Sequence, residues 1–294
     1  MTCVRKAWLT LGSSSLLLED ESMGYVCSSL DLGAPAIREV VNNNPNRDGV
    51  TDQTRFFGSR LVTAEVIAAK SWGAQIDAVA TSFDQYMVPS ARPVLHYILD
   101  RPGAAERTLT LRAASYDWKV EGDMMRDIQM QWVAADPIAR DPTVQTATAW
   151  AGTGTLGRVY NLVFPRVYPI GASLPTVGII VGQGDVPIQP YLRIFGPITA
   201  PKVTMRNNMA PVVQSNIWLT SRIDAGHFVG IDTVRHTARL DDDPNQSVLS
   251  LLDWANTTWP VLPNAPDSTQ LSLAGTGTTT STQVVASWQD GYLT

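Results

Sequence analysis

Apolar and polar residues alternate with a period of two along most of the chain. Residues 6–12, 60–68 and 216–223 each place one set of side chains on one face of an extended strand and a more polar set on the other. A strand with this alternation buries one face and leaves the other near solvent. The pattern predicts a mainly β protein built from half-buried strands.

One stretch has the spacing of an α-helix instead. Over residues 74–87, apolar side chains recur three and four positions apart, which gathers them on one side of a helix. Pro89 follows and cannot continue a helix, because it has no backbone N–H. We therefore expect an α+β N-terminal region with one principal helix.

A short segment marks the predicted domain joint. Residues 135–142 contain two prolines and three charged residues, a composition typical of linkers. The predicted domains are residues 1–140 and 141–294, both of ordinary size. The second domain has short strands separated by Gly- and Pro-containing turns, which favours a β-sandwich.

The bulk composition excludes several classes of protein. Only 17% of the 294 residues are charged and the net charge is −5. Basic residues never form a run of five, so we expect no specific nucleic-acid groove. The longest apolar stretches fall short of 18 residues, so we expect no membrane span. The low charge content is a weak indication of self-association.

The N-terminus imitates a secretory signal only faintly. Gly12 and three serines interrupt its apolar run, and acidic residues follow at once. We expect a strand and a turn there rather than an export signal. Cys3 and Cys27 are not spaced as a zinc motif. We expect both cysteines to be reduced, although a bridge between neighbouring strands is possible.

Motifs for catalysis and cofactors are missing from the sequence. It contains no nucleophile elbow, no phosphate-binding P-loop and no G-x-G-x-x-G fingerprint placed between a strand and a helix. Residues 152–157 are glycine-rich but no helix is predicted after them, so they fit a loop better than a phosphate cradle. The sequence does not exclude a pair of catalytic carboxylates for glycoside cleavage, because the distance between two such groups is a spatial property. We expect no enzyme and no cofactor.

The densest polar stretch is residues 226–243, which contain two of the three histidines. A metal site is one interpretation, with His227, His236 and Asp232 as candidate ligands, but their spacing matches no metal motif. The alternative is a β-hairpin in which Asp232 begins the turn. A second turn would follow at residues 241–245. We favour the hairpin, with no metal ligands and no catalytic residues.

Two further features have more than one interpretation. Arg47, Asp48 and Gly49 could imitate an adhesion tripeptide, but Asp-Gly is also a strong signal for a hairpin turn, which we favour. Nine tryptophans could stack on sugars. Positions in the core or at subunit contacts explain most of them equally well.

Residues 25–66 resemble the N-terminal domain of distal tail (Dit-like) proteins of long-tailed phages. The matching positions are Asp48, Gly49, Gly58, Arg60 and Val62. The resemblance implies a ring-forming β domain in the first half of the chain.

Residues 160–171, 190–205, 226–240 and 284–293 are similar to minor tail proteins of phages that infect actinobacteria. There the resemblance implies a galectin-like β-sandwich, with Gly196, Pro201 and Asp232 at structural positions. Ala200 stands where the family commonly has Asn, and a turn at residues 263–266 also departs from its pattern. The sugar-binding signature of true galectins has no counterpart here.

The resemblance implies a structural virion protein that is made in the host cytoplasm and functions at the phage tail tip. Six copies would form a ring at the distal end of the tail tube. The partners would be the tail tube protein, the tape-measure protein, the tail-tip hub and receptor-binding or minor tail proteins. DNA would pass through the ring without specific binding. The alternatives are a carbohydrate-binding module for host wall glycans and a hydrolase of wall polymer.

Overall fold

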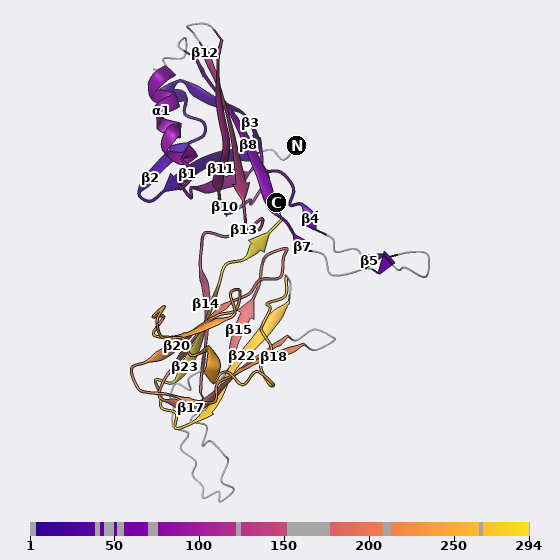
Figure 1. Cartoon of the computed structure of the whole chain (residues 1–294), viewed down its shortest axis with the longest axis vertical. Coiled ribbons are helices and arrows are strands. Elements are labelled where there is room, and N and C mark those ends of the chain that lie inside the picture. The colour runs from indigo at the N-terminus through magenta and orange to yellow at the C-terminus, as the bar shows by residue number, and fades with distance from the viewer. Residues whose placement is uncertain are drawn as a thin grey trace, which may run out of the picture. The chain divides into compact units, whose positions relative to one another are not determined.

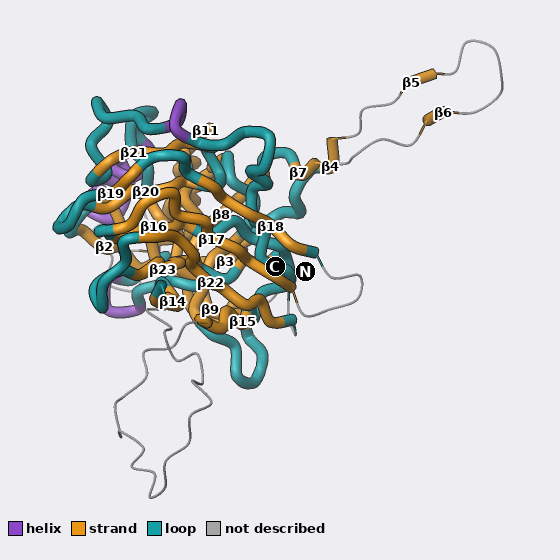
Figure 2. The backbone as a smooth tube through the Cα atoms, turned by 90° about the horizontal axis from the view of Figure 1, so that it is seen from below, coloured by secondary structure: helices purple, strands orange, loops and turns teal. Residues whose placement is uncertain are grey.

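The computed structural model describes residues 4–38, 42–43, 50–51, 56–69, 76–121, 125–151, 177–207, 213–264 and 267–293. The chain divides into two compact units, shown in Figure 1. The first consists of Met1–Pro142 and the last three residues, Tyr292–Thr294, and the second of Thr143–Gly291. Strands dominate the described residues, so the prediction of a mainly β fold is confirmed (Figure 2).

Two antiparallel sheets form the first unit. The six-stranded sheet has the order β2 (Ser14–Leu17), β1 (Val4–Leu11), β9 (Val94–Leu99), β10 (Glu106–Thr110), β13 (Ala139–Arg140) and β24 (Gly291–Tyr292). The four-stranded sheet has the order β11 (Arg112–Glu121), β12 (Met125–Ala134), β8 (Arg60–Ala69) and β3 (Tyr25–Asp31). The predicted N-terminal strand and turn are therefore the β1–β2 hairpin, in which Gly12 takes a positive φ of 61°.

The helix α1 (Ile76–Met87) completes the core of the first unit. Its buried residues Val79, Phe83, Tyr86 and Met87 recur at helical spacing, so one side of the helix enters the core. That core also contains the inward-facing residues of both sheets. The described helix lies within the predicted range 74–87 and ends at the predicted residue, while residues 74 and 75 lie outside the described residues.

Two short strand pairs lie between β3 and β8. β4 (Ile37–Arg38) pairs with β7 (Phe56–Phe57), and β5 (Asn42–Asn43) pairs with β6 (Val50–Thr51). Both views show these pairs extending away from the sheets of their own unit (Figures 1 and 2). We call them the projecting arm.

The second unit consists of two antiparallel sheets that share one core. One has the order β14 (Gln145–Trp150), β23 (Gln283–Trp288), β16 (Tyr191–Phe195), β20 (Phe228–Asp232) and β21 (Thr237–Leu240). The other has the order β15 (Val177–Val181), β22 (Ser268–Thr276), β17 (Ile198–Asn207) and β18 (Gln214–Trp218), with β19 (Arg222–Ile223) also paired to β17. Alternate residues are buried in several of these strands, such as β15, β16 and β23, whereas β20 buries three consecutive residues.

The strand predicted over residues 216–223 is interrupted in the structure. β18 ends at Trp218 and β19 begins at Arg222, with a turn between them. Ile217, Leu219 and Ile223 are all buried nevertheless. The alternation therefore predicted the buried face correctly but not the break. Within the described part of the chain, no helix has the length and apolar character to cross a membrane.

Candidate functional site

The four-stranded sheet of the first unit presents one face away from the core, and this face carries both polar and apolar side chains. Alternate residues of β8 and β12 enter the core, among them Val62, Val66, Ile128 and Trp132. The residues between them point away from this core, because successive side chains of a strand alternate sides. We call this surface the open face; its described side chains include Ser29, Asp31, Thr63, Glu65, Ser115, Asp117, Lys119, Asp127, Gln129 and Gln131.

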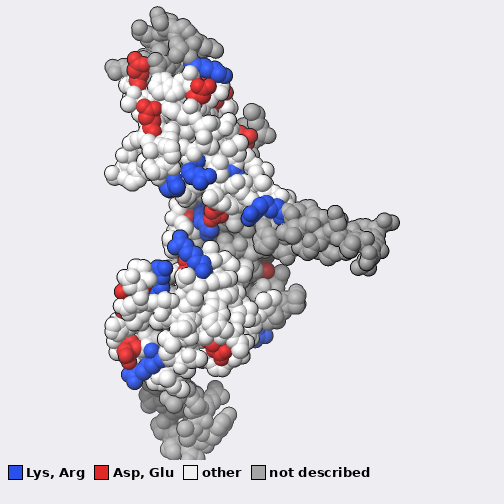
Figure 3. Space-filling view, viewed as in Figure 1, with Lys and Arg blue, Asp and Glu red and all other residues white. Residues whose placement is uncertain are grey.

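Negative charge dominates the open face. Asp31, Glu65, Asp117 and Asp127 supply four carboxylates among its described side chains, against the two cationic groups of Lys119 and Arg112. Fixed negative charge of this kind repels phosphate groups. On the side of the molecule that Figure 3 shows, most of the described surface is uncharged.

Two carboxylates on the open face are linked through an amide. Gln129 Nε2 lies 3.4 Å from Glu65 Oε1 and 3.4 Å from Asp127 Oδ2, so it donates toward both. Burial raises the pKa of Asp127, and the nearby charge of Glu65 raises it further. The sheet thus holds two acidic groups close together at an energetic cost.

Residues 226–243 form the predicted hairpin. β20 and β21 pair in antiparallel register, with Asp232 opposite Thr237. Asp232 Oδ1 accepts hydrogen bonds from the backbone N–H groups of Val234 and Arg235, at 3.0 and 2.9 Å, and so begins the turn. The interpretation of Asp232 as a turn-starting residue fits this geometry.

The two histidines of the hairpin have different partners. His227 Nδ1 lies 2.6 Å from Asp241 Oδ2, and this hydrogen bond raises the pKa of His227. His236 instead stacks on Trp259, with ring centroids 4.4 Å apart. Across the described ranges, no three His, Cys, Asp or Glu side chains gather as a metal site would require.

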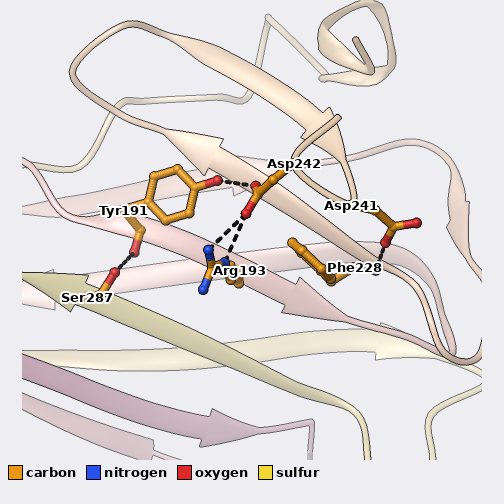
Figure 4. Close-up of polar contacts among 6 residues, drawn as sticks. All are labelled: Tyr191, Arg193, Phe228, Asp241, Asp242 and Ser287. Carbon is orange, nitrogen blue, oxygen red and sulfur yellow. Dashed lines mark hydrogen bonds and ion pairs between the residues drawn. The ribbon is translucent and has the colours of Figure 1, made fainter. Parts of the chain in front are cut away.

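A cluster that the sequence analysis did not find lies on the same sheet (Figure 4). Asp242 accepts hydrogen bonds from the Tyr191 hydroxyl and from Arg193, whose NH2 group is 2.8 Å away. Burial, followed by the Asp242 contact, raises the pKa of Tyr191 to about 12. A Cβ atom at Gly230 would meet the Asp242 carboxylate and the Tyr191 hydroxyl, so a side chain there would have to displace the cluster. Gly230 within a strand was the one sequence signal of this close approach.

The remaining motif residues make local backbone contacts or lie outside the described residues. Asp48 and Gly49 belong to the latter group. The Gly58 N–H donates to the Ala36 carbonyl at 2.6 Å, at the base of the projecting arm. A Cβ atom at Gly196 would lie 2.2 Å from the Asp224 carbonyl oxygen. The Pro201 carbonyl accepts from the Leu219 N–H at 3.0 Å.

Arg60 is almost completely buried, with 1% of its surface exposed. Its guanidinium donates to the backbone carbonyl of Leu293. Burial lowers the pKa of Arg60, while the neighbouring Tyr97 acts in the opposite direction. In the same unit, the Arg107 guanidinium lies 3.8 Å from the centre of the Tyr292 ring. Two cationic side chains therefore bind the C-terminal residues to the first unit.

Comparisons with known proteins give a match only at the level of structure. No protein-family model matches the sequence, and no curated protein matches it. The crystal structure of SPP1 Dit (gp 19.1), titled a paradigm of hub adsorption apparatus in phages that infect Gram-positive bacteria, aligns with a TM-score of 0.61. It covers 98% of this chain and 99% of its own, with 11% sequence identity. The chain has the fold of a Dit protein.

Two structures of the activated phage p2 baseplate, one with Ca and one with Sr, also align. Their TM-scores are 0.47 and 0.48, their identities are 10% and 11%, and each covers 97% of this chain.

Proposed function

We propose that this chain is the distal tail protein of a long-tailed phage, a structural virion protein that forms a hexameric ring at the end of the tail tube. The observation that carries the proposal is the full-length similarity to SPP1 Dit, because it spans both units in order. The sequence resemblance over residues 25–66 supports the same proposal and is independent of the structure.

The four-stranded sheet offers a way to close the ring. Its outermost strands are β11 and β3, and the backbone groups along a free sheet edge can pair with another strand. If β11 of one copy meets β3 of the next, the contact is heterologous, and six such contacts close with sixfold symmetry. The six sheets would then form one continuous barrel.

The projecting arm offers a second contact between copies. Ile37 and Phe57 are direct cross-strand neighbours on the arm, and their exposed fractions are 62% and 41%. Neighbouring apolar side chains that are exposed to solvent in the single chain are typical of protein interfaces. We propose that the arm lies against the neighbouring copy.

The open face would line the channel of such a barrel, because the opposite face of the sheet is already buried against the core. Its excess of carboxylates would repel the phosphates of passing DNA. The protein would therefore let DNA pass without binding it.

The second unit would project from the ring as a galectin-like sandwich. It would serve as an attachment site for neighbouring tail proteins such as the tape-measure protein, the tail-tip hub and receptor-binding or minor tail proteins, while the ring contacts the tail tube protein. A host among the actinobacteria follows from the sequence resemblance. The proposed role is structural and not enzymatic.

Native mass spectrometry of the purified chain tests ring formation. We expect a hexamer at high protein concentration, and we expect Ile37→Ser with Phe57→Ser to shift the protein toward smaller species. Ile179→Ser is the matched control, because Ile179 is 54% exposed but belongs to the second unit. A defined oligomer of another size, or a hexamer unaffected by the arm substitutions, would contradict the proposed number or the proposed contact.

A further inference from the structure

Three aromatic rings form a cluster on loops of the second unit. His236 and Trp259 stack with an angle of 12° between their planes. Trp254 packs against Trp259 at 6.3 Å between ring centres and an angle of 60°. Trp254 is 55% exposed, although tryptophan is usually among the more buried residues. We call these three residues the aromatic cluster.

Local hydrogen bonds stabilise the turn that carries the exposed ring. Trp254 lies in a turn that Asp253 begins, and Asp253 Oδ1 accepts from the Ala255 N–H at 3.2 Å. The Asn256 side chain closes the turn by donating to Asp253 Oδ2 at 2.7 Å. An Asp-started turn limits backbone motion. The backbone that carries the exposed Trp254 ring is thus held within a hydrogen-bonded turn.

The backbone at His236 is fixed in an unusual conformation. His236 has a φ of 54°, in the left-handed region that favours glycine and asparagine. Histidine adopts it here at the end of the β20–β21 turn, which Asp232 begins. The stack on Trp259 offsets part of this cost, and it fixes the orientation of Trp259 in return.

The surroundings of the cluster are polar, and they include the Asp253 carboxylate on the Trp254 turn. Asp232 and Arg235 partly neutralise one another across 3.8 Å, so the loop next to His236 has little net charge. Asn256 presents a fixed carboxamide on the same turn as Trp254. An aromatic face beside fixed polar groups suits a pyranose, which has an apolar C–H face and a rim of hydroxyl groups.

We propose that the aromatic cluster binds saccharides, with the pyranose ring stacked on Trp254 and its hydroxyl groups directed toward the Asn256 and Asp253 side chains. Trp259 and His236 act as positioning residues that set the angle of the platform. The site does not depend on ring closure. The saccharide-binding proposal can therefore be tested separately from the proposed assembly. The surface cluster of Tyr191, Arg193 and Asp242 is not part of it.

Binding to immobilised hexasaccharides tests the proposal. The probes are neutral hexamers of glucose, galactose, mannose and N-acetylglucosamine, and the protein is the full chain. We expect binding to at least one of them, weakened roughly tenfold or more by Trp254→Ala and less by Trp254→Phe. His236→Asn, which suits a positive φ, should weaken binding by a smaller factor while the protein stays folded.

Two controls make the result decisive. Trp118 is 37% exposed and belongs to the first unit, so Trp118→Ala should leave saccharide binding unchanged. Circular dichroism and thermal unfolding verify that each variant is folded. Failure of the wild-type chain to bind any of the four probes would overturn the proposal. Equal binding by the wild type and Trp254→Ala would do the same, as would a Trp254→Ala defect confined to contacts with another tail protein.

Discussion

The Arg60 guanidinium donates a hydrogen bond to the backbone carbonyl of Leu293, 233 positions further along the chain. Arg60 begins β8 in the four-stranded sheet, whereas Tyr292 belongs to β24 at the edge of the six-stranded sheet. The chain therefore leaves the first unit, forms the whole second unit and returns to complete the first. The fold of the first unit depends on residues from both ends of the sequence.

Deletion of residues 292–294 should destabilise the first unit. The truncation removes the acceptor of a buried cation and the ring beneath Arg107, and a buried polar group that loses its partner costs about 1–3 kcal/mol. Urea unfolding should show the loss in the transition of the first unit, while the second unit keeps its midpoint.

Arg60→Met separates the hydrogen bond from other effects of this truncation. With no guanidinium present, the deletion should cost clearly less than it does in the wild-type background, which a double-mutant cycle measures. Equal costs in the two backgrounds would mean that Leu293 does not stabilise the first unit through Arg60.

The isolated fragment Thr143–Gly291 should fold on its own. It contains a complete core of its own and is of ordinary domain size. We expect a soluble, β-rich monomer with one cooperative unfolding transition, measured by circular dichroism and analytical ultracentrifugation. An aggregated fragment would show that the second unit needs the rest of the chain, and a fragment that forms rings would place assembly in the wrong unit.

Many of the strands could be predicted from the sequence, because a strand that buries alternate residues shows an alternation of apolar and polar positions. Asp232 was predicted to begin a turn, and its carboxylate accepts two backbone N–H groups there. The break after Trp218 was missed because the buried pattern continues through the turn to Ile223. The return of Tyr292 to the first unit could not be predicted, since short edge strands have no periodicity to detect.

The functional surfaces were harder to predict than the strands. Glu65 is 64 positions from Gln129 in the sequence, and it meets Gln129 and Asp127 only because β8 and β12 pair in a particular register. Likewise, the spacing of His227 and His236 gave no sign that one would contact Asp241 and the other Trp259. Charge on a sheet face and stacking between loops depend on pairing that a single sequence does not reveal.

Asp127→Asn should stabilise the protein at neutral pH. The pKa of Asp127 is raised in the fold by burial and by Glu65, so the folded state binds its proton more strongly than the unfolded state does. The carboxylate therefore reduces stability above its folded pKa. We expect a gain of about 0.2–1 kcal/mol at pH 7, the range of cross-strand charge pairs.

The gain should shrink as the pH falls through the raised pKa of Asp127, because the wild-type carboxyl then becomes neutral as well. Asp117→Asn is the matched control on β11, where the side chain is exposed and pairs across from Gln129. Chemical denaturation at several pH values measures both variants. A pH-independent gain, or an equal gain from Asp117→Asn, would contradict the electrostatic account.

Ala200→Gly should stabilise the second unit. Ala200 has a φ of 49°, and left-handed backbone is costly for residues with a Cβ atom. We expect a gain of about 0.5–1 kcal/mol after the entropy cost of glycine. Ala200→Asn should also be tolerated, since asparagine accepts this conformation.

Ala274→Gly provides the comparison, because Ala274 lies in β22 without a positive φ. That change should destabilise the unit, as glycine does within strands. Thermal unfolding of the two variants side by side gives the sign of each effect. Destabilisation of similar size in both would mean that the backbone at Ala200 is not strained.

Electron cryo-microscopy of the assembled tail, with the averaged ring resolved to its strands, tests the central claim most directly. We expect six copies of the first unit around the tail axis, with β11 of each copy beside β3 of the next and the carboxylates of Glu65 and Asp127 facing the channel. A tail in which the chain forms no ring, or a ring whose channel is lined by a different surface, would contradict the account.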